Sequence, residues 1–217
     1  MRQKRNSVAN IFFEVRWLCL SCLIFLINGC IQSSANNNSS ASTIEIQKIK
    51  TEIKSGDVIT RTGNDFTSQT LRQLNRRNKK YSHIGIAVIE NDSVFVYHAL
   101  GGDFNPTQII LREPFELFVD KKNNFAFGIF RYSGESKKLG GAISACKSFY
   151  NAKIPFDMDF NLATNDKMYC AEFVAKSFLQ GDKTLNFKKS EIAEKVFYGI
   201  DDIFLNPAFK AIKELTY

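Results

Sequence analysis

The chain offers three side chains suited to nucleophilic catalysis: Cys170 and the only two histidines of the 217-residue sequence, His83 and His98. Cys170 lies in the segment 168–178, where positions 170, 173, 174, 177 and 178 have the spacing of one buried helix face. We expect Asn165 or Asp166 to cap this helix, so that Cys170 falls near its first turn. A helix N-terminus stabilises a thiolate, which is the form that attacks carbonyl carbon. The alternative is that Cys170 is a small core residue.

The two histidines occur in neighbouring segments that alternate like strands. Residues 81–89 place bulky aliphatic side chains on one face, and His83 with Gly85 and Ala87 on the other. Residues 94–98 form the next predicted strand, which ends at His98. A face of small residues allows another element to approach closely. We therefore expect the helix that carries Cys170 to pack against the face of His83.

The turn between these strands decides whether the histidines meet. If Asn91 and Asp92 form a two-residue hairpin loop, Glu90 pairs with Ser93 and His98 lies opposite residue 85. Both histidines then share a face, one diagonal step apart. A three-residue loop without a bulge would instead put them on opposite faces.

Together the three side chains match the requirements of a thiol hydrolase. Cys170 is the candidate nucleophile, His83 the base that takes its proton, and His98 the group that orients the base. The backbone N–H of Cys170 is expected to contribute to an oxyanion hole, with Ser82 or Tyr169 as a second donor.

The remaining pattern indicates an α+β fold with a central antiparallel sheet flanked by helices. A turn at Gly56-Asp57 leads into a short strand, and residues 66–78 suit a helix with positions 66, 70, 71 and 74 inward. Further strands are predicted at 109–111 and 125–132, and helical segments at 114–119, 137–151 and 190–199. Asn206-Pro207 is typical of the start of a last helix.

Composition is that of a globular protein, with 44% hydrophobic and 24% charged residues. The net charge of +7 is divided between the N-terminus and a mildly basic remainder. The basic residues at 72–80 lack interleaved aromatics, so we do not expect nucleic-acid binding. No paired ligand spacing predicts a metal site, and no phosphate loop or dinucleotide motif predicts a cofactor.

The N-terminus is predicted to be a targeting segment. Residues 1–29 contain a basic start and an apolar run at 17–27, which is short for a membrane span and typical of a signal peptide. Residues 27–30 resemble a bacterial lipobox that ends in a lipidated Cys30, and residues 30–43 have the composition of a flexible tether. The alternatives are an ordinary signal peptide or an uncleaved anchor helix. Ile31 after the cysteine resembles lipoproteins sorted to the outer membrane, so we expect a lipid-anchored protein of the bacterial cell envelope.

Cys146 is the second cysteine of the predicted domain at residues 44–217. It lies on an apolar helix face, and we interpret it as a core residue. In an exported protein a bridge between Cys146 and Cys170 is also conceivable, and it would exclude the nucleophilic role.

Five short motifs, in order, resemble the permuted papain-like amidases of the YaeF/YiiX type, within the NlpC-type superfamily. They are Gly56–Ile59, Ser82–Ile86, Val96–Ala99, Pro155–Asp157 and Tyr169–Val174. The order of histidine strand, polar strand and cysteine helix also resembles the lecithin:retinol acyltransferase group. The resemblance implies a permuted papain-like fold with the nucleophile at the start of a packed helix. It also assigns Cys170 as nucleophile, His83 as base and His98 as the third polar position, which is an acid in some relatives. We interpret Asp57, Asp157 and Glu172 as structural.

The resulting hypothesis is an exported cysteine amidase or peptidase, tethered to a membrane through lipid on Cys30. Its substrate would contain an amide or peptide bond, with cell-wall peptide as the natural candidate. One alternative is a thiol acyltransferase or lipid hydrolase that uses the same residues. The other is a non-catalytic lipoprotein binding module, which a Cys146–Cys170 bridge or histidines on opposite faces would favour.

Overall fold

The computed structural model describes residues 44–102 and 105–217. The predicted signal peptide at 1–29, the lipidated Cys30 and the tether at 30–43 lie outside the described residues, and these assignments remain predictions. Among the described residues, no helix is both long enough and apolar enough to cross a membrane.

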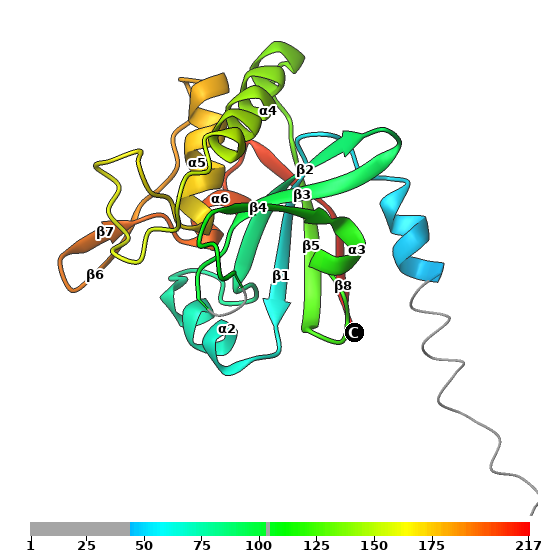
Figure 1. Ribbon diagram of the computed structural model, residues 1–217, viewed down its shortest axis with the longest axis horizontal. Helices are drawn as coiled ribbons and strands as arrows, with labels where there is room; N and C mark the ends of the chain where they lie inside the picture. The colour runs from blue at the N-terminus through cyan, green and yellow to red at the C-terminus, as the bar shows by residue number, and fades with distance from the viewer. Residues whose placement is uncertain (1–43, 103–104) are drawn as a thin grey trace, which may run out of the picture. The chain divides into compact units, whose positions relative to one another are not determined.

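A six-stranded antiparallel sheet forms the centre of the fold, in the order β4-β3-β2-β1-β5-β8 (Figure 1). Its strands are β1 (Val58–Gly63), β2 (His83–Glu90), β3 (Ser93–Ala99), β4 (Ile110–Pro114), β5 (Asn124–Tyr132) and β8 (Phe209–Thr216). The helices are α2 (Phe66–Leu71), continued by a 3-10 turn Arg72–Leu74, α3 (Phe115–Phe118), α4 (Ser136–Asn151), α5 (Cys170–Gly181) and α6 (Ile200–Phe204), with a further helical segment at 44–50. A separate hairpin consists of β6 (Ser190–Ile192) and β7 (Lys195–Phe197). The α+β prediction with a central antiparallel sheet is confirmed.

The predicted register between β2 and β3 is confirmed. Glu90 pairs with Ser93, and the ladder continues to Ile86 opposite Tyr97. The two loop residues between these strands have φ angles of 49° and 61°. Positive φ at both positions is the geometry of the two-residue turn that matches the twist of a hairpin. This turn therefore sets which face of β3 carries His98.

The two faces of the sheet are covered by different elements. Helices α4 and α5 lie side by side on one face (Figure 1), where α5 packs against Ile84, Ile86 and Val88. The opposite face is covered by α3 and by the segment 44–53, whose Ile49 and Ile53 join its core. The prediction that the cysteine helix packs on the face of His83 is therefore wrong. Both faces of β2 are buried, so its alternating pattern does not determine which face receives the cysteine helix.

Three predicted helical features differ from the structure. The sequence pattern predicts Phe66 and Leu71 inward, but they are 85% and 38% exposed, because the helix is only a short segment followed by a 3-10 turn. Residues 190–199 form the β6–β7 hairpin and the approach to α6 instead of a helix. The residues after Asn206-Pro207 form β8, which pairs with β5 at the sheet edge. Residues 129 and 130 of β5 pair with 213 and 211, so Ile212 is an extra residue that bulges from β8.

Candidate active site

Cys170 is the first residue of α5, at the helix N-terminus that the sequence predicted. The capping position is Tyr169 with extended backbone, so the prediction of Asn165 or Asp166 as the cap is wrong. The Tyr169 N–H donates to Glu172 Oε2 at 3.3 Å, and the Tyr169 hydroxyl accepts from the Tyr198 N–H at 2.7 Å. Buried contacts from later in the chain therefore fix the start of this helix.

The electrostatics of the Cys170 thiol combine two opposing effects. Burial raises its pKa to about 11, while the backbone N–H groups of Ala171, Cys170 and Ile84 and the charge of Arg61 lower it in part. The helix terminus does favour the thiolate, as predicted, but desolvation is the larger effect. With neutral histidines nearby, Cys170 is therefore a thiol at neutral pH, and nucleophilic attack requires a base to accept its proton.

The two histidines are in direct contact, as the register predicts. His83 Nε2 lies 2.8 Å from His98 Nδ1, and the rings meet edge to face at an interplanar angle of 87°. A Cβ on Gly85 would lie only 2.7 Å from the Tyr97 carbonyl oxygen and 3.0 Å from His98 Cβ, so a glycine is needed for this approach. Burial, followed by the charge of Arg61, lowers the pKa of His83 well below its usual range. Burial likewise lowers the pKa of His98.

Two charged side chains that the sequence analysis did not single out complete the cluster. Glu113 of β4 places Oε1 2.8 Å from His98 Nε2. Arg61 of β1 lies opposite His83 in the sheet, and its Nη1 is 3.8 Å from the same carboxylate oxygen. Arg61 Nη1 also donates to the Phe118 carbonyl at 3.0 Å, with the guanidinium 4.5 Å from the Phe118 ring centroid.

The sequence contains a signal for one of these two residues but not for the other. Extending the predicted strand 58–60 by one residue would have included Arg61, next to His83 in the sheet. Glu113 lies diagonally across from His98, because β3 and β4 pair Val96 with Glu113. The strands are joined by a ten-residue connection at 100–109, and no short hairpin turn in the sequence predicts their register.

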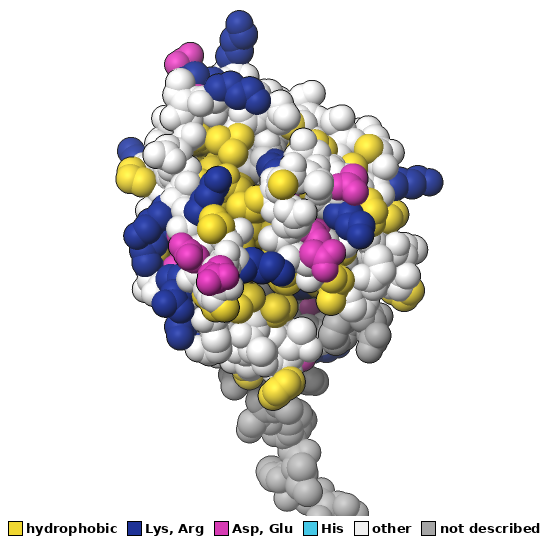
Figure 2. Space-filling model, turned by 90° about the vertical axis from the view of Figure 1, so that its left-hand side faces the viewer, with side chains coloured by type: hydrophobic (Ala, Val, Ile, Leu, Met, Phe, Trp, Pro, Cys, Tyr) yellow, Lys and Arg dark blue, Asp and Glu magenta, His cyan; other side chains and the backbone are white. Residues whose placement is uncertain are grey.

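A cleft of about 570 Å³ brings the candidate residues together. Arg61, His83, Glu113 and Cys170 all line it. In the described part of the chain, no hydrogen bond joins the Cys170 sulfur directly to His83, and such contacts are often long before substrate binds. Most of the cleft wall is apolar, with contributions from Leu71, Leu117, Phe156, Met158, Phe160 and Phe197. Figure 2, which views the side of the molecule with α2 and the β6–β7 hairpin, shows hydrophobic side chains gathered in a hollow with charged side chains around it.

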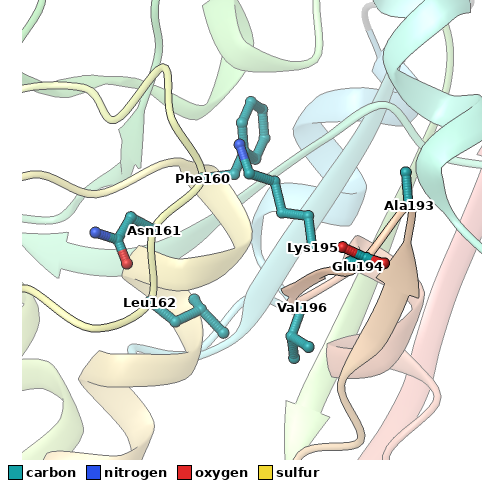
Figure 3. Close-up of a pocket in the computed structure, with 7 residues that line it drawn as sticks. All are labelled: Phe160, Asn161, Leu162, Ala193, Glu194, Lys195 and Val196. Carbon is teal, nitrogen blue, oxygen red and sulfur yellow. The ribbon is translucent and has the colours of Figure 1, made fainter.

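A second, more open groove of about 410 Å³ lies between residues 160–162 and the tip of the β6–β7 hairpin. Figure 3 shows these two segments facing each other, with Leu162 on one side and Val196 on the other. The groove is lined by no cysteine or histidine, although Phe160 borders both it and the cleft. The chemistry therefore belongs to the cleft.

Other residues singled out in the sequence have structural contacts. Ser82 Oγ accepts from the Gly63 N–H at 2.9 Å. Asp57 forms a bidentate pair with Arg131 at 2.8 and 2.7 Å, and Asp157 accepts from two backbone N–H groups of its own loop. Glu172 is fully buried and pairs with Lys176 at 2.7 Å. Cys146 is buried in the core, and neither it nor Cys170 forms a disulfide.

Within residues 44–102 and 105–217, no group of three histidine, cysteine or acidic side chains could hold a metal ion. The facing nitrogens of His83 and His98 point at one another and do not converge on a common point. The sulfur, imidazole and backbone N–H groups are instead the parts of a thiol hydrolase.

A known protein family matches this sequence. The sequence model of the permuted papain-like amidases, the YaeF/YiiX or C92 peptidase family, matches residues 52–203, more than half of the chain. The chain belongs to this family. Members of the C92 family are papain-like cysteine peptidases and amidases, so the prediction of a cysteine hydrolase is confirmed.

A solved structure shares the fold. The crystal structure of metalloprotein YiiX from Escherichia coli O157:H7 is similar with a TM-score of 0.61 and 16% identity, over 76% of this chain and 98% of that one. At this identity the likeness concerns the fold alone. A search of curated proteins found no match.

Proposed function

We propose that this protein is an exported, lipid-anchored cysteine amidase in which Cys170, His83 and His98 perform the chemistry. The observation that carries the proposal is the 2.8 Å contact between the two buried imidazoles, beside a cleft lined by both His83 and a helix-terminal cysteine. Family membership supports the reaction class.

The reaction begins with a neutral pair of thiol and imidazole. His83 takes the Cys170 proton as the sulfur attacks the amide carbonyl carbon, which fits a thiol whose burial raises its pKa to about 11. The backbone N–H of Cys170 stabilises the developing oxyanion. His83 then protonates the leaving nitrogen, and an amine departs from a thioester. Water, deprotonated by His83, hydrolyses the thioester to a carboxylic acid and regenerates the thiol.

The N-terminal sequence supports an envelope location for this activity. A signal peptide at 1–29, lipid on Cys30 and a tether to residue 43 would hold the domain at a bacterial membrane, and Ile31 favours the outer one. Peptide amides of the cell wall are the substrates accessible there. The proposal therefore names peptidoglycan stem peptides as the first class to test.

The direct test is alkylation of the full-length protein by iodoacetamide across pH 5–10, with the modified cysteine located by peptide mass mapping. An assembled pair gives a plateau of Cys170 labelling below about pH 8, which the His83→Gln variant removes. Cys146 is an internal control because it is fully buried. If Cys170 reacted only above about pH 9, with or without His83, the proposed chemistry would be wrong. If the plateau is observed, release of an amine from peptidoglycan fragments would identify the bond that the enzyme cleaves.

A second candidate function is transfer or hydrolysis of a lipid acyl group by the same residues. The apolar walls of the cleft favour it, because they would accommodate a hydrocarbon chain. Comparing acyl donors of increasing chain length distinguishes the two: a rate that rises with chain length supports the acyl substrate. Two features would have favoured the binding-module alternative: a Cys146–Cys170 bridge and histidines on opposite faces. In the described residues both cysteines are free and the histidines share a face.

A further inference from the structure

The buried polar cluster continues beyond the two histidines to a carboxylate. Glu113 Oε1 lies 2.8 Å from His98 Nε2, and His98 Nδ1 lies 2.8 Å from His83 Nε2. We propose that Glu113 is a positioning residue that fixes the tautomer of both histidines and balances the buried charge of Arg61. This inference rests on the proposed role of His83 as base.

The tautomers follow from the chemistry of the three groups. His98 Nε2 lies 2.8 Å from the carboxylate, although their approach is not that of a well-aligned hydrogen bond. An ionised carboxylate attracts an N–H and repels a lone pair, so we place the proton of His98 on Nε2, toward Glu113. His98 Nδ1 then has a lone pair and accepts from the N–H at Nε2 of His83. One ring nitrogen of His83, Nδ1, is left without a proton. It is the nitrogen available to take the proton of Cys170.

The second effect of Glu113 is electrostatic. The side chain of Arg61 is 17% exposed, and its charge adds to the effect of burial in lowering the pKa of both histidines, which opposes formation of an imidazolium. Glu113 acts in the opposite direction and raises the pKa of His98. Among the other groups around the pair, α3 contributes the uncharged ring of Phe118, α5 contributes the Cys170 thiol, and Asp65 also acts on Arg61. Glu113 is therefore the carboxylate in direct contact with the histidine pair.

This arrangement makes a quantitative prediction for the substitution Glu113→Gln. The glutamine is nearly isosteric but neutral, and its amide can donate to His98 Nε2 and reverse both tautomers. Loss of the negative charge lowers the proton affinity of the pair. The acid limb of the Cys170 labelling profile should then move to lower pH, and the plateau rate should fall. If the acid limb of the labelling profile moves down by one pH unit, the plateau rate should fall about tenfold. Both quantities depend on how readily His83 forms an imidazolium.

The experiment measures rate constants of iodoacetamide labelling at Cys170 in the full-length protein from pH 5 to 10. The variants are Glu113→Gln, Arg61→Gln and, as a matched control on the next helix, Glu116→Gln, whose carboxylate pairs with Lys50 at 2.5 Å. We expect the plateau of Glu113→Gln to fall about 10-fold or more, within the range of general-base effects. Arg61→Gln should move the acid limb in the opposite direction, to higher pH. The Glu116→Gln profile should match the wild type.

A structural measurement on the unmodified protein tests the tautomers without any variant. Nitrogen-15 NMR of the histidine rings should show the proton on Nε2 of both His83 and His98. Finding either proton on Nδ1 would overturn the inference. It would also be overturned if Glu113→Gln labelled like Glu116→Gln while His83→Gln still abolished the plateau. Absence of a plateau in the wild type would instead refute the proposed function itself, and the two failures are therefore distinguishable.

Discussion

The two faces of the central sheet differ in what they bury. On the face under α4 and α5, aliphatic side chains of the sheet such as Ile86 share a core with Phe173 and Phe178 of α5. The face under α3 buries His83 and His98 beside the Phe118 ring, with the charges of Arg61 and Glu113 at its margin. One face receives the helix that begins at Cys170, and the other buries the two histidines.

Cys170 and His83 therefore line one cleft near the start of β2 without sharing a face of the sheet. The pairing of β2 with β3 ends at Ile86 and Tyr97, just before Gly85 and His98. Beyond that point, burial raises the pKa of the Cys170 thiol, and the backbone N–H of Ile84 offsets part of this rise. Substitutions on the apolar face should therefore change mainly the stability of the fold, and substitutions on the polar face should also change the reactivity of Cys170.

The largest expected effect is on the chemistry alone. Cys170→Ala and His83→Gln should each reduce amide hydrolysis by about 10³-fold or more, because nucleophile and base act as a unit. Thermal unfolding should change little in Cys170→Ala, because the substitution deletes a single atom from a residue of intermediate burial at a helix end. Hydrolysis assays with matched melting curves check this. Residual activity above a tenth of wild type in Cys170→Ala would remove the cysteine from the mechanism.

Truncating one aromatic residue on each face compares the two cores directly. Phe173→Ala in α5 and Phe118→Ala in α3 both delete a fully buried ring, and each should reduce the free energy of unfolding by about 3–5 kcal/mol. Only Phe118→Ala should also slow Cys170 labelling in the folded protein, because its ring contacts both imidazoles and the guanidinium. Equal labelling in the two variants would contradict the division between the faces. Urea unfolding and labelling rates give both quantities.

Substituting Gly85→Ala tests the closeness of the histidine strands. The new methyl group would overlap the Tyr97 carbonyl and His98 Cβ, so we expect a loss of about 1–3 kcal/mol in the free energy of unfolding. The His83–His98 contact should lengthen, and the labelling plateau should fall. A variant with wild-type stability and labelling would show that the strands separate more easily than the contact distances imply.

The smallest effect concerns stability against pH. Both histidines have pKa values lowered by burial, so the unfolded chain binds protons between the folded pKa and about 6.5 that the folded chain does not. Stability is therefore complete above about pH 6.5 and decreases as the pH falls, by up to about 1.4 kcal/mol per pH unit for each histidine. Denaturant unfolding at pH 7 and pH 5.5 measures this slope. The double variant His83→Gln/His98→Gln should show a flatter dependence.

The parts of the fold governed by short-range rules could be predicted from the sequence. The alternation along β2 and β3 and the turn at Asn91-Asp92 decide the register, and with it the contact of His83 with His98. The apolar spacing after Cys170 likewise located α5, although the cap that placed Cys170 near its start was assigned to the wrong residue.

The predictions that were wrong or missing concern features that tertiary contacts determine. Both faces of β2 are apolar enough to be buried, so its pattern could not decide which face receives α5. The β6–β7 hairpin turns at Ala193 and Glu194, which adopt positive φ without being typical turn residues, and helix propensity there was misleading. Glu113 meets His98 only through the β3–β4 register, which no local turn specifies.

The bulge at Ile212 also bears on how copies of the protein behave toward one another. Strand β8 forms an edge of the sheet, where unpaired backbone groups could recruit a strand from a second molecule. The extra residue interrupts the regular ladder, and Lys210 and Lys213 place positive charge along the same strand. A flat, uncharged edge would favour aggregation at high protein concentration, and β8 is neither flat nor uncharged.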